Sequence, residues 1–435
     1  MKDEGIEGTE RFLSPDKGRG LRALRPFAVG ELVFTCPAYC YVLTVNERGA
    51  HCENCFSRRE DLSKCGKCKQ AYYCNVDCQR ADWPMHKLEC VAMCAHGDDW
   101  CPSEVVRLVA RIILKQRVST ERTQSERLLL LREFEAHLDK MDSEKDEMNR
   151  TDIAALRHFY GKYIQDLPDE KSLTELFAQV NCNGFTIEDE ELSHLGSAVY
   201  PDVALMNHSC SPNVIVTYKG TVAEVRAVQE INPGDEIFNS YIDLLYPTDD
   251  RKERLLDSYF FTCQCTECTT RSKDDEKMEI RKLSTPPEPA DVRSMVCYAK
   301  NVIEEFRRAK HYKTPSELLE MCELSQEKMG AIFADTNVYM LHMMYQAMGV
   351  CLYMEDWDGA LNYGEKIILP YSVHYPAYSL NVASIYLKLG HLYLGLEKKS
   401  QGVKALSKAL AIMEVAHGKD HHYVAEVKRE IASHQ

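Results

Sequence analysis

A short cysteine-rich block carries the strongest chemical signal in the sequence. Between residues 52 and 90, thiols and one imidazole occur in four close pairs, Cys52 and Cys55, Cys65 and Cys68, Cys74 and Cys78, and His86 and Cys90. A tetrahedral zinc ion takes four such ligands, so the block predicts two ions. Because the block has few apolar residues, the metals must supply its folding energy. Disulfides are the alternative, and they do not suit a chain without a secretion signal.

The residues between these ligands resemble the MYND zinc finger, notably Tyr72-Tyr73-Cys74 and the tail Trp83-Pro84-x-His86-Lys87. The resemblance implies two interleaved ligand sets, Cys52, Cys55, Cys74 and Cys78 on one ion, and Cys65, Cys68, His86 and Cys90 on the other. Both sites are then closed and structural, without an open coordination position. A RING-type finger is also interleaved, but this spacing fits MYND better.

Three separated segments together resemble the SET domain: KGRGL at 17–21, LMNHSCSPN at 205–213 and GDEIFNSY at 234–241. Each is a weak match alone, but their order argues against coincidence. A MYND finger lies between the first two segments, and a later cysteine pattern matches the post-SET segment. Over nearly its whole length the chain therefore resembles the SET- and MYND-domain lysine methyltransferases. One departure is Asp235, which stands where many relatives carry Glu.

The loop at 17–21 suits a ligand that the backbone must approach closely. Gly18 and Gly20 permit that approach, and Lys17 and Arg19 bring positive charge. In SET proteins this loop holds the methionine portion of S-adenosyl-L-methionine, whose carboxylate suits basic residues. The resemblance therefore implies this cofactor, with Lys17, Gly18 and Arg19 among its contacts.

Further cofactor contacts follow from the family pattern. Asn207 offers an amide to the amino-acid end of the cofactor, and His208 lies where relatives bind the adenine. Glu135 and His137 match positions that reach the ribose, and we expect both in a helical insert. The remaining pocket residues implied by the resemblance are Cys182, Asn183, Ala204, Tyr241, Tyr259, Phe260 and Phe261.

A third zinc site is implied by the post-SET cysteines. Cys210 would complete a set of four thiolates with Cys263, Cys265 and Cys268. This site would pin the post-SET segment over the active site, where aromatic side chains complete a wall. The sequence thus predicts three zinc ions in all.

Methyl transfer from a sulfonium to an amine is an in-line displacement, so positioning should dominate catalysis. The substrate lysine must arrive neutral, although its reference pKa is about 10.4. A nearby sulfonium and a dry aromatic channel both lower that pKa. We expect Phe185, Tyr241 and Tyr259 to line the channel, and the Tyr241 hydroxyl to orient the amine and the methyl donor.

Hydrophobic patterning predicts the elements that position these residues. Short apolar runs at 22–45 predict a small β-meander. Residues 214–228 predict a β-hairpin, followed by a short strand at 236–238. Helical spacing between 103 and 164, opened by a serine cap, predicts two or three helices beside the sheet.

The fold class predicted is α+β: a SET β-fold split by a MYND finger and a helical insert, with a zinc-binding post-SET segment and an all-helical tetratricopeptide-like C-terminal domain. Small residues near Gly349, Gly359, Gly390 and Ala405 echo the positions where such helix pairs interlock, although their spacing is irregular. The expected parts are 1–51 (first part of SET), 52–90 (MYND), 91–180 (helical insert), 181–246 (core SET), 247–280 (post-SET) and 281–435 (helical domain).

Bulk composition limits the class of protein. A chain of 435 residues is too long for one compact core, so several domains are expected. Its hydrophobic content of 45% is that of a globular protein. No signal peptide or membrane-spanning run is expected, and the 19 cysteines suit reducing compartments, so we expect a cytoplasmic and nuclear location. The net charge of −14 argues against direct nucleic-acid binding and favours cationic protein partners.

The resemblance implies substrates among histone tails and non-histone proteins, with effects on chromatin and transcription, and a monomeric enzyme. Two alternatives stay open. A non-catalytic adaptor would bind partner peptides through its MYND and tetratricopeptide-like domains, and its cofactor motifs would be damaged, whereas the motifs here are intact. A zinc-finger ubiquitin ligase would leave the SET segments unexplained.

Overall fold

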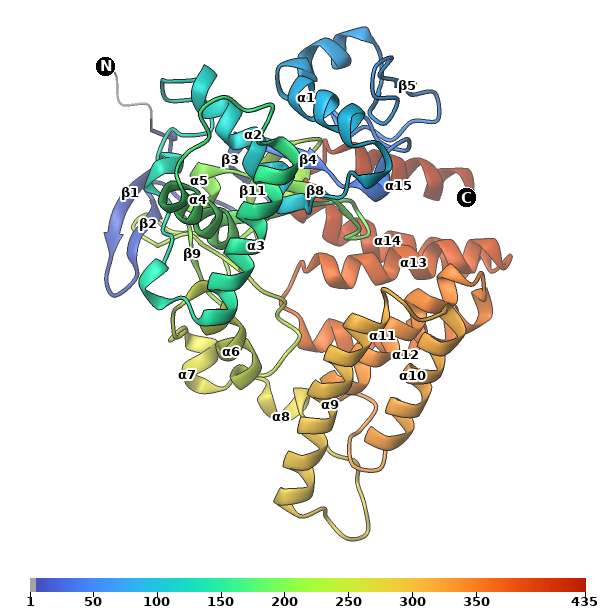
Figure 1. Cartoon of the computed structure of the whole chain (residues 1–435). Helices are drawn as coiled ribbons and strands as arrows, with labels where there is room; N and C mark the ends of the chain where they lie inside the picture. The colour runs from blue at the N-terminus through green and yellow to red at the C-terminus, as the bar shows by residue number, and fades with distance from the viewer. Residues whose placement is uncertain (1–4) are drawn as a thin grey trace. The chain divides into compact units, whose positions relative to one another are not determined.

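The computed structural model describes residues 5–435, so the first four residues of the expected segment 1–51 lie outside the described residues. Contacts divide the chain into two compact units, the first made of 5–208, 212–239 and 258–260, and the second of 209–211, 240–257 and 261–435. The first mixes strands and helices, and the second is nearly all helical, which confirms the predicted fold class (Figure 1). The finer domain boundaries stay predictions.

All named strands belong to the first unit. They are β1 (Thr9–Ser14), β2 (Gly18–Ala23), β3 (Leu32–Pro37), β4 (Cys40–Leu43), β5 (Ser63–Lys64), β6 (Tyr72–Tyr73), β7 (Gly184–Glu188), β8 (His194–Val199), β9 (Asn207–His208), β10 (Val214–Lys219), β11 (Val222–Ala227) and β12 (Phe238–Asn239). They form five small sheets, β1-β2, β10-β11-β3, β12-β9, β4-β8-β7 and β5-β6. Only β9 and β12 pair in parallel among these strands.

The β-meander expected at 22–45 is wrong. Its strands enter three different sheets, because β2 pairs with β1, β3 with β11, and β4 with β8. Between β3 and β4, the backbone N–H of Tyr39 already donates to Val199 O at 2.9 Å, so the chain has joined the next sheet there. Strand character is visible in the local pattern, but the partner of a strand is a long-range property.

The hairpin expected at 214–228 is confirmed by β10 and β11, whose register runs from Val214 opposite Ala227 to Lys219 opposite Val222. The strand expected at 236–238 is shorter and displaced to β12. Glu236 itself forms only an isolated bridge, because the side-chain amide of Asn213 bonds to the backbone on both sides of Ile237.

The helices of the first unit pack beside its sheets. They are α1 (Val76–His96), α2 (Glu104–Val118), α3 (Ser143–Tyr160), α4 (Glu170–Asn183) and the short α5 (Pro201–Ala204). Ser103 caps α2 as predicted, since its hydroxyl accepts from Val106 N. The apolar face of α2 contacts β4 and β8, so the predicted helical insert covers the sheet that carries Phe185.

The segment at 119–142 is not α-helical, although two or three helices were expected between 103 and 164. Its backbone is held by tertiary hydrogen bonds instead. The fully buried carboxylate of Asp202 accepts from Arg127 N at 3.1 Å and from Leu128 N at 2.7 Å. Glu135 and His137 therefore lie in an irregular stretch and not on a helix. These long-range bonds override the helix propensity of the local sequence.

A buried cluster of charges joins the cysteine-rich module to the sheet. Arg107 of α2 donates to Glu89 of α1 at 2.6 Å and to the backbone oxygen of Leu43 in β4 at 2.8 Å. Arg48 and Arg111 also contact the Glu89 carboxylate. Burial raises the pKa of Glu89, but the three guanidinium groups outweigh burial and hold it below its ordinary value. The charge cluster adds to the small apolar cluster of the module in holding it to the sheet.

The second unit is a succession of helices. After α6 (Thr248–Tyr259), whose last two residues belong to the first unit, come α7 (Thr266–Thr270), α8 (Asp274–Lys277), α9 (Pro289–Ala309), α10 (Pro315–Met329), α11 (Val338–Tyr353), α12 (Trp357–His374), α13 (Leu380–Gly395), α14 (Lys399–Ala416) and α15 (His422–Ser433). A Cβ on Gly390 in α13 would lie 2.6 Å from the side chain of Leu406 in α14, so these two helices interlock there as expected. Gly349 has open space, and no interlock occurs at it.

Within residues 5–435, none of the helices combines the length and the apolar character needed to cross a bilayer.

We predict that Arg107→Leu lowers the free energy of unfolding of the first unit by about 3 kcal/mol, because the variant leaves part of a buried carboxylate without its partner. Arg157→Leu is the control, since Arg157 pairs with Glu170 on the exposed surface and its loss should cost less than about 1 kcal/mol. Urea unfolding followed by circular dichroism measures both. Equal losses for the two variants would contradict a special role for the buried cluster.

Candidate active site and metal centres

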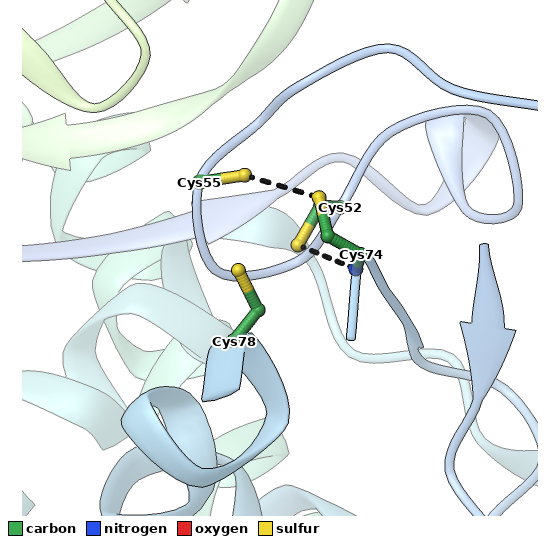
Figure 2. A group of neighbouring side chains, drawn as sticks. All are labelled: Cys52, Cys55, Cys74 and Cys78. Carbon is green, nitrogen blue, oxygen red and sulfur yellow. Dashed lines mark hydrogen bonds between the residues drawn. The ribbon is translucent and has the colours of Figure 1, made fainter. Parts of the chain in front are cut away.

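The first predicted ligand set is brought together in the cysteine-rich module. Cys52, Cys55, Cys74 and Cys78 place their sulfur atoms within 4.8 Å of one another (Figure 2). Cys74 follows β6 and Cys78 lies in the first turn of α1, where its N–H donates to the Asn75 cap at 3.0 Å. Cys55 Sγ and Cys74 Sγ are 3.5 Å apart. The edge of a zinc tetrahedron with sulfur ligands is about 3.8 Å, so the spacing fits.

The second set, Cys65, Cys68, His86 and Cys90, also forms one cluster. α1 supplies His86 and Cys90 from one face, because residues four apart lie above each other on a helix. Cys65 Sγ is 3.9 Å from Cys90 Sγ, and Cys68 Sγ is 3.6 Å from His86 Nε2. Burial lowers the pKa of His86, which favours the neutral imidazole that binds a metal.

The third set lies in the second unit. Cys210 joins Cys263, Cys265 and Cys268, and Cys210 Sγ is 3.6 Å from Cys268 Sγ. Arg251 adds a buried positive charge, donating from Nη2 to Cys268 Sγ at 3.6 Å. Hydrogen bonds from Cys210 and then other neighbours, including Arg251, lower the pKa of Cys268 to about 7. None of the nineteen cysteines is in a disulfide, contrary to the disulfide alternative, and each of the three clusters could hold a zinc ion.

The glycine-containing loop and two distant segments meet in a hydrogen-bonded cradle in the first unit. Asn207 Nδ2 donates to Arg19 O at 2.9 Å and to Glu236 Oε2 at 2.8 Å. A Cβ on Gly20 would lie 2.8 Å from Asn207 Nδ2 and 2.9 Å from Glu236 Oε2, so only glycine fits between them. Gly18 adopts a φ of +76°, which also favours glycine.

The side chain of Arg19 fixes the loop to the irregular segment at 131–137. Its Nη2 donates to Glu133 O at 2.7 Å and lies 3.3 Å from Glu135 Oε1. Asn183, at the end of α4, donates from Nδ2 to Glu135 O at 3.1 Å. Three of the predicted cofactor residues, Arg19, Glu135 and Asn183, are thus linked by direct hydrogen bonds. Lys17 places its Nζ 5.0 Å from the ring centroid of Phe238 in β12.

His137 stands on this segment in the left-handed conformation, with φ at 52°. Its ring centroid is 5.3 Å from that of Phe260, which is another predicted cofactor residue. Burial lowers the pKa of His137, so the imidazole is neutral near pH 7. Burial, and then the nearby Glu135 carboxylate, raise the pKa of Cys182 to about 11, which keeps this side chain a thiol.

The remaining cofactor residues lie on short elements. Ala204 ends α5, the helix whose Asp202 binds the 127–129 backbone. His208 is buried in β9, which pairs in parallel with β12 and sets His208 opposite Asn239. The parallel pairing brings the second and third motif segments side by side. Most of the residues predicted for the cofactor thus belong to the first unit.

The aromatic residues predicted for catalysis fall into both units. Tyr241 and Phe261 belong to the second, where their rings meet edge to face with centroids 6.4 Å apart. Phe185 in β7 and Tyr259 at the end of α6 belong to the first, and the Phe185 ring lies 5.7 Å from that of Tyr200.

Two residues of the cradle were missed as site residues, although both stand inside the quoted motif segments. Glu236 accepts hydrogen bonds from Asn207 and from the hydroxyl of Ser14. Asn213 donates to Glu236 O at 2.9 Å and accepts from Phe238 N at 2.8 Å, which holds the third segment in place. The available signal for Glu236 was an ionisable side chain inside the third motif segment, at 234–241.

Comparison with known proteins agrees with this site. The family model described as the SET domain matches residues 18–242, slightly more than half of the chain. Over 99% of both chains, the sequence is 79% identical to N-lysine methyltransferase SMYD2-A of Danio rerio. It is 72% identical to N-lysine methyltransferase SMYD2 of Homo sapiens over 100% of both chains.

Among solved structures, a Rubisco LSMT bound to sinefungin and monomethyllysine is similar at a TM-score of 0.37 and 11% identity, covering 100% of this chain and 88% of that one. A likeness at this level carries no argument here. The family match spans the greater part of the three motif segments, and the relatives are similar over the full chain. The chain belongs to the SET-domain family, within its SMYD2 group of N-lysine methyltransferases.

Proposed function

We propose that this N-lysine methyltransferase transfers a methyl group from S-adenosyl-L-methionine to the ε-amine of lysines in histones and in non-histone proteins, and thereby regulates chromatin and transcription. The observation that carries the proposal is the cradle in which Asn207 joins the Arg19 loop to Glu236. It supports a binding site for an amino-acid group. The non-catalytic adaptor is not favoured, because the cofactor motifs are intact and assembled.

The residues present fit the cofactor. The backbone at Gly18 is open to close approach, and Lys17 and Arg19 bring positive charge for a carboxylate. We propose that Asn207 accepts from the amine of the methionine portion and that His208 bonds to the adenine. Glu135 and His137 would face the ribose, with Cys182, Asn183, Ala204 and the aromatic residues Tyr259, Phe260 and Phe261 as walls.

Catalysis would then depend on positioning. The cofactor supplies the methyl group on a sulfonium, and the residues of this chain hold the amine in line with it. We propose that the Tyr241 hydroxyl accepts from the lysine amine and orients its lone pair. The rings of Phe185, Tyr241 and Tyr259 would exclude water, which lowers the pKa of the lysine and favours the neutral nucleophile.

The two zinc ions of the finger and the third ion of the post-SET segment would be structural. Each proposed site offers four protein ligands and so leaves no open position for a reactant. The third ion would fix the segment from Cys263 to Cys268 at Cys210, and with it the neighbouring Phe261. We therefore propose that this ion affects activity only through the position of that segment.

We further propose that the enzyme acts as a monomer in the cytoplasm and nucleus, and that its finger and helical domain bind partner peptides. Nineteen cysteines without a disulfide suit a reducing compartment. A net charge of −14 favours cationic protein segments over nucleic acid. Transfer of tritiated methyl groups to a panel of histones and cytosolic proteins tests the substrate proposal, and labelling of none of them by zinc-replete enzyme would contradict it.

We predict that Tyr241→Phe lowers kcat about 100-fold, because the variant loses the hydroxyl that orients the amine. The affinity for S-adenosylhomocysteine, measured by calorimetry, should stay within about twofold, since the ring is kept. Tyr353→Phe is the matched control, because Tyr353 is 79% exposed at the end of α11 and should leave turnover unchanged. An unchanged kcat in Tyr241→Phe would remove Tyr241 from the mechanism.

We predict that the purified chain holds three zinc ions and that Cys268→Ser reduces this to about two, because three thiolates bind zinc less tightly than four. Plasma emission spectroscopy measures the metal, and a colorimetric thiol assay after chelation checks its release. Cys297→Ser is the control, since Cys297 is exposed and belongs to none of the clusters. Three ions retained in Cys268→Ser would show that this cluster is not a metal site.

A further inference from the structure

We propose that Glu236 is a positioning residue, which fixes the orientation of the Asn207 side-chain amide and thereby makes the site selective for a ligand with an α-amino group. The inference rests on the proposed function, because it concerns how the same site recognises the amino-acid end of its cofactor. Glu236 itself need not touch the ligand.

The geometry leaves the Asn207 amide one orientation. An amide group has two ends, an NH₂ that only donates and an oxygen that only accepts. Both acceptors that face Asn207, the carbonyl oxygen of Arg19 at 2.9 Å and the Glu236 carboxylate at 2.8 Å, require the NH₂ end. The two hydrogens of the NH₂ match these two acceptors. The Asn207 oxygen is therefore turned away from them and presented as an acceptor.

The carboxylate is held in place from its other side. The hydroxyl of Ser14 at the end of β1 donates to Glu236 Oε1, so the two carboxylate oxygens have separate donors. The backbone oxygen of Glu236 accepts from Asn213 Nδ2 at 2.9 Å. Gly20 lets this arrangement close, since a side chain there would meet both the amide nitrogen and the carboxylate. Glu236 therefore cannot turn away without losing several bonds at once.

The charge of the acceptor at 236 strengthens the hold on the Asn207 amide. The neutral backbone oxygen of Arg19 accepts one Asn207 hydrogen whichever residue stands at 236. Glutamine at 236 has the same shape as glutamate, but it can present either its oxygen or its NH₂ to Asn207, and in the second case the other Asn207 hydrogen loses its acceptor. The amide is then held by one bond, so its oxygen is presented to an ammonium less firmly. The preference of the site for an α-amino group thus depends on the carboxylate at 236.

The experiment compares two probes by calorimetry on the full zinc-loaded chain: S-adenosylhomocysteine and its analogue that lacks the α-amino group. In the wild type we expect the analogue to bind at least about tenfold more weakly, the value of one charge-assisted hydrogen bond. In Glu236→Gln we expect S-adenosylhomocysteine to lose about tenfold in affinity while the analogue changes less than about twofold. The ratio of the two dissociation constants should therefore approach one.

Two further variants make the test specific. Asp235→Asn removes one negative charge from the adjacent exposed turn, where Asp235 accepts from Asn232 N at 2.9 Å, and it should leave the ratio unchanged. Ser14→Ala frees one side of the Glu236 carboxylate and should lower the ratio in the same direction by a smaller factor. Thermal unfolding of each variant shows whether the fold is kept. If Glu236→Gln does not fold, the ratio measured for Ser14→Ala tests the inference.

A purely structural role for Glu236 would weaken both probes by the same factor and leave the ratio as in the wild type, and that result would overturn the inference. It would leave the proposed function intact as long as the wild type still transfers methyl groups to lysine. If the wild type bound neither probe, the proposed function itself would fail. Equal affinity of the wild type for both probes would also overturn the inference.

Discussion

The structure of the site depends on one small hydrogen-bonded junction. The amide of Asn207 joins the carbonyl oxygen of Arg19, 188 residues earlier in the chain, to the carboxylate of Glu236, 29 residues later. Its two bonds are possible only because Gly20 has no side chain to separate them. Because these partly buried polar groups satisfy one another, each of the three segments is held in position by the other two. The start of β2, the parallel pair β9-β12 and the segment that leads to Tyr241 all meet at this junction.

A second set of polar interactions gives the cysteine-rich module a rigid attachment. Glu89 lies on the same helix as the ligands Cys78, His86 and Cys90, and it bonds to Arg107 of the next helix. Movement of α1 would therefore disturb both the ligand positions and a buried ion pair. Breaking such a pair inside a protein leaves an uncompensated charge, so the module is held to the sheet more firmly than its small apolar cluster alone would allow.

Local features of this chain could be predicted from sequence, and long-range ones could not. The spacing of the cysteine and histidine pairs predicted two metal ions in the finger, and the resemblance to MYND gave the division into two ligand sets. The β10-β11 hairpin follows from alternation around Gly220. The strand partners of β2, β3 and β4 did not follow, because pairing is chosen by segments far away in the chain. Glu135 and His137 were expected on a helix, and only the buried Asp202 explains why their segment is irregular. Glu236 could be noticed as an ionisable residue inside a motif segment, but its role depends on contacts with Ser14 and Asn207 that only the fold creates.

The first unit is discontinuous in the chain, and this affects the order in which the protein can be completed during synthesis. The ligands of the finger are all present once residue 90 has left the ribosome, so that module could take up its metal early. The junction at Asn207 has to wait for Glu236, and the third cluster has to wait for Cys268. Until Asn207 and Glu236 have been made, the Ser14 hydroxyl and the Arg19 backbone oxygen on the β1-β2 hairpin lack their hydrogen-bond partners. Nascent chains shorter than about 240 residues therefore expose unpaired polar groups and strand edges, which makes them targets for chaperones.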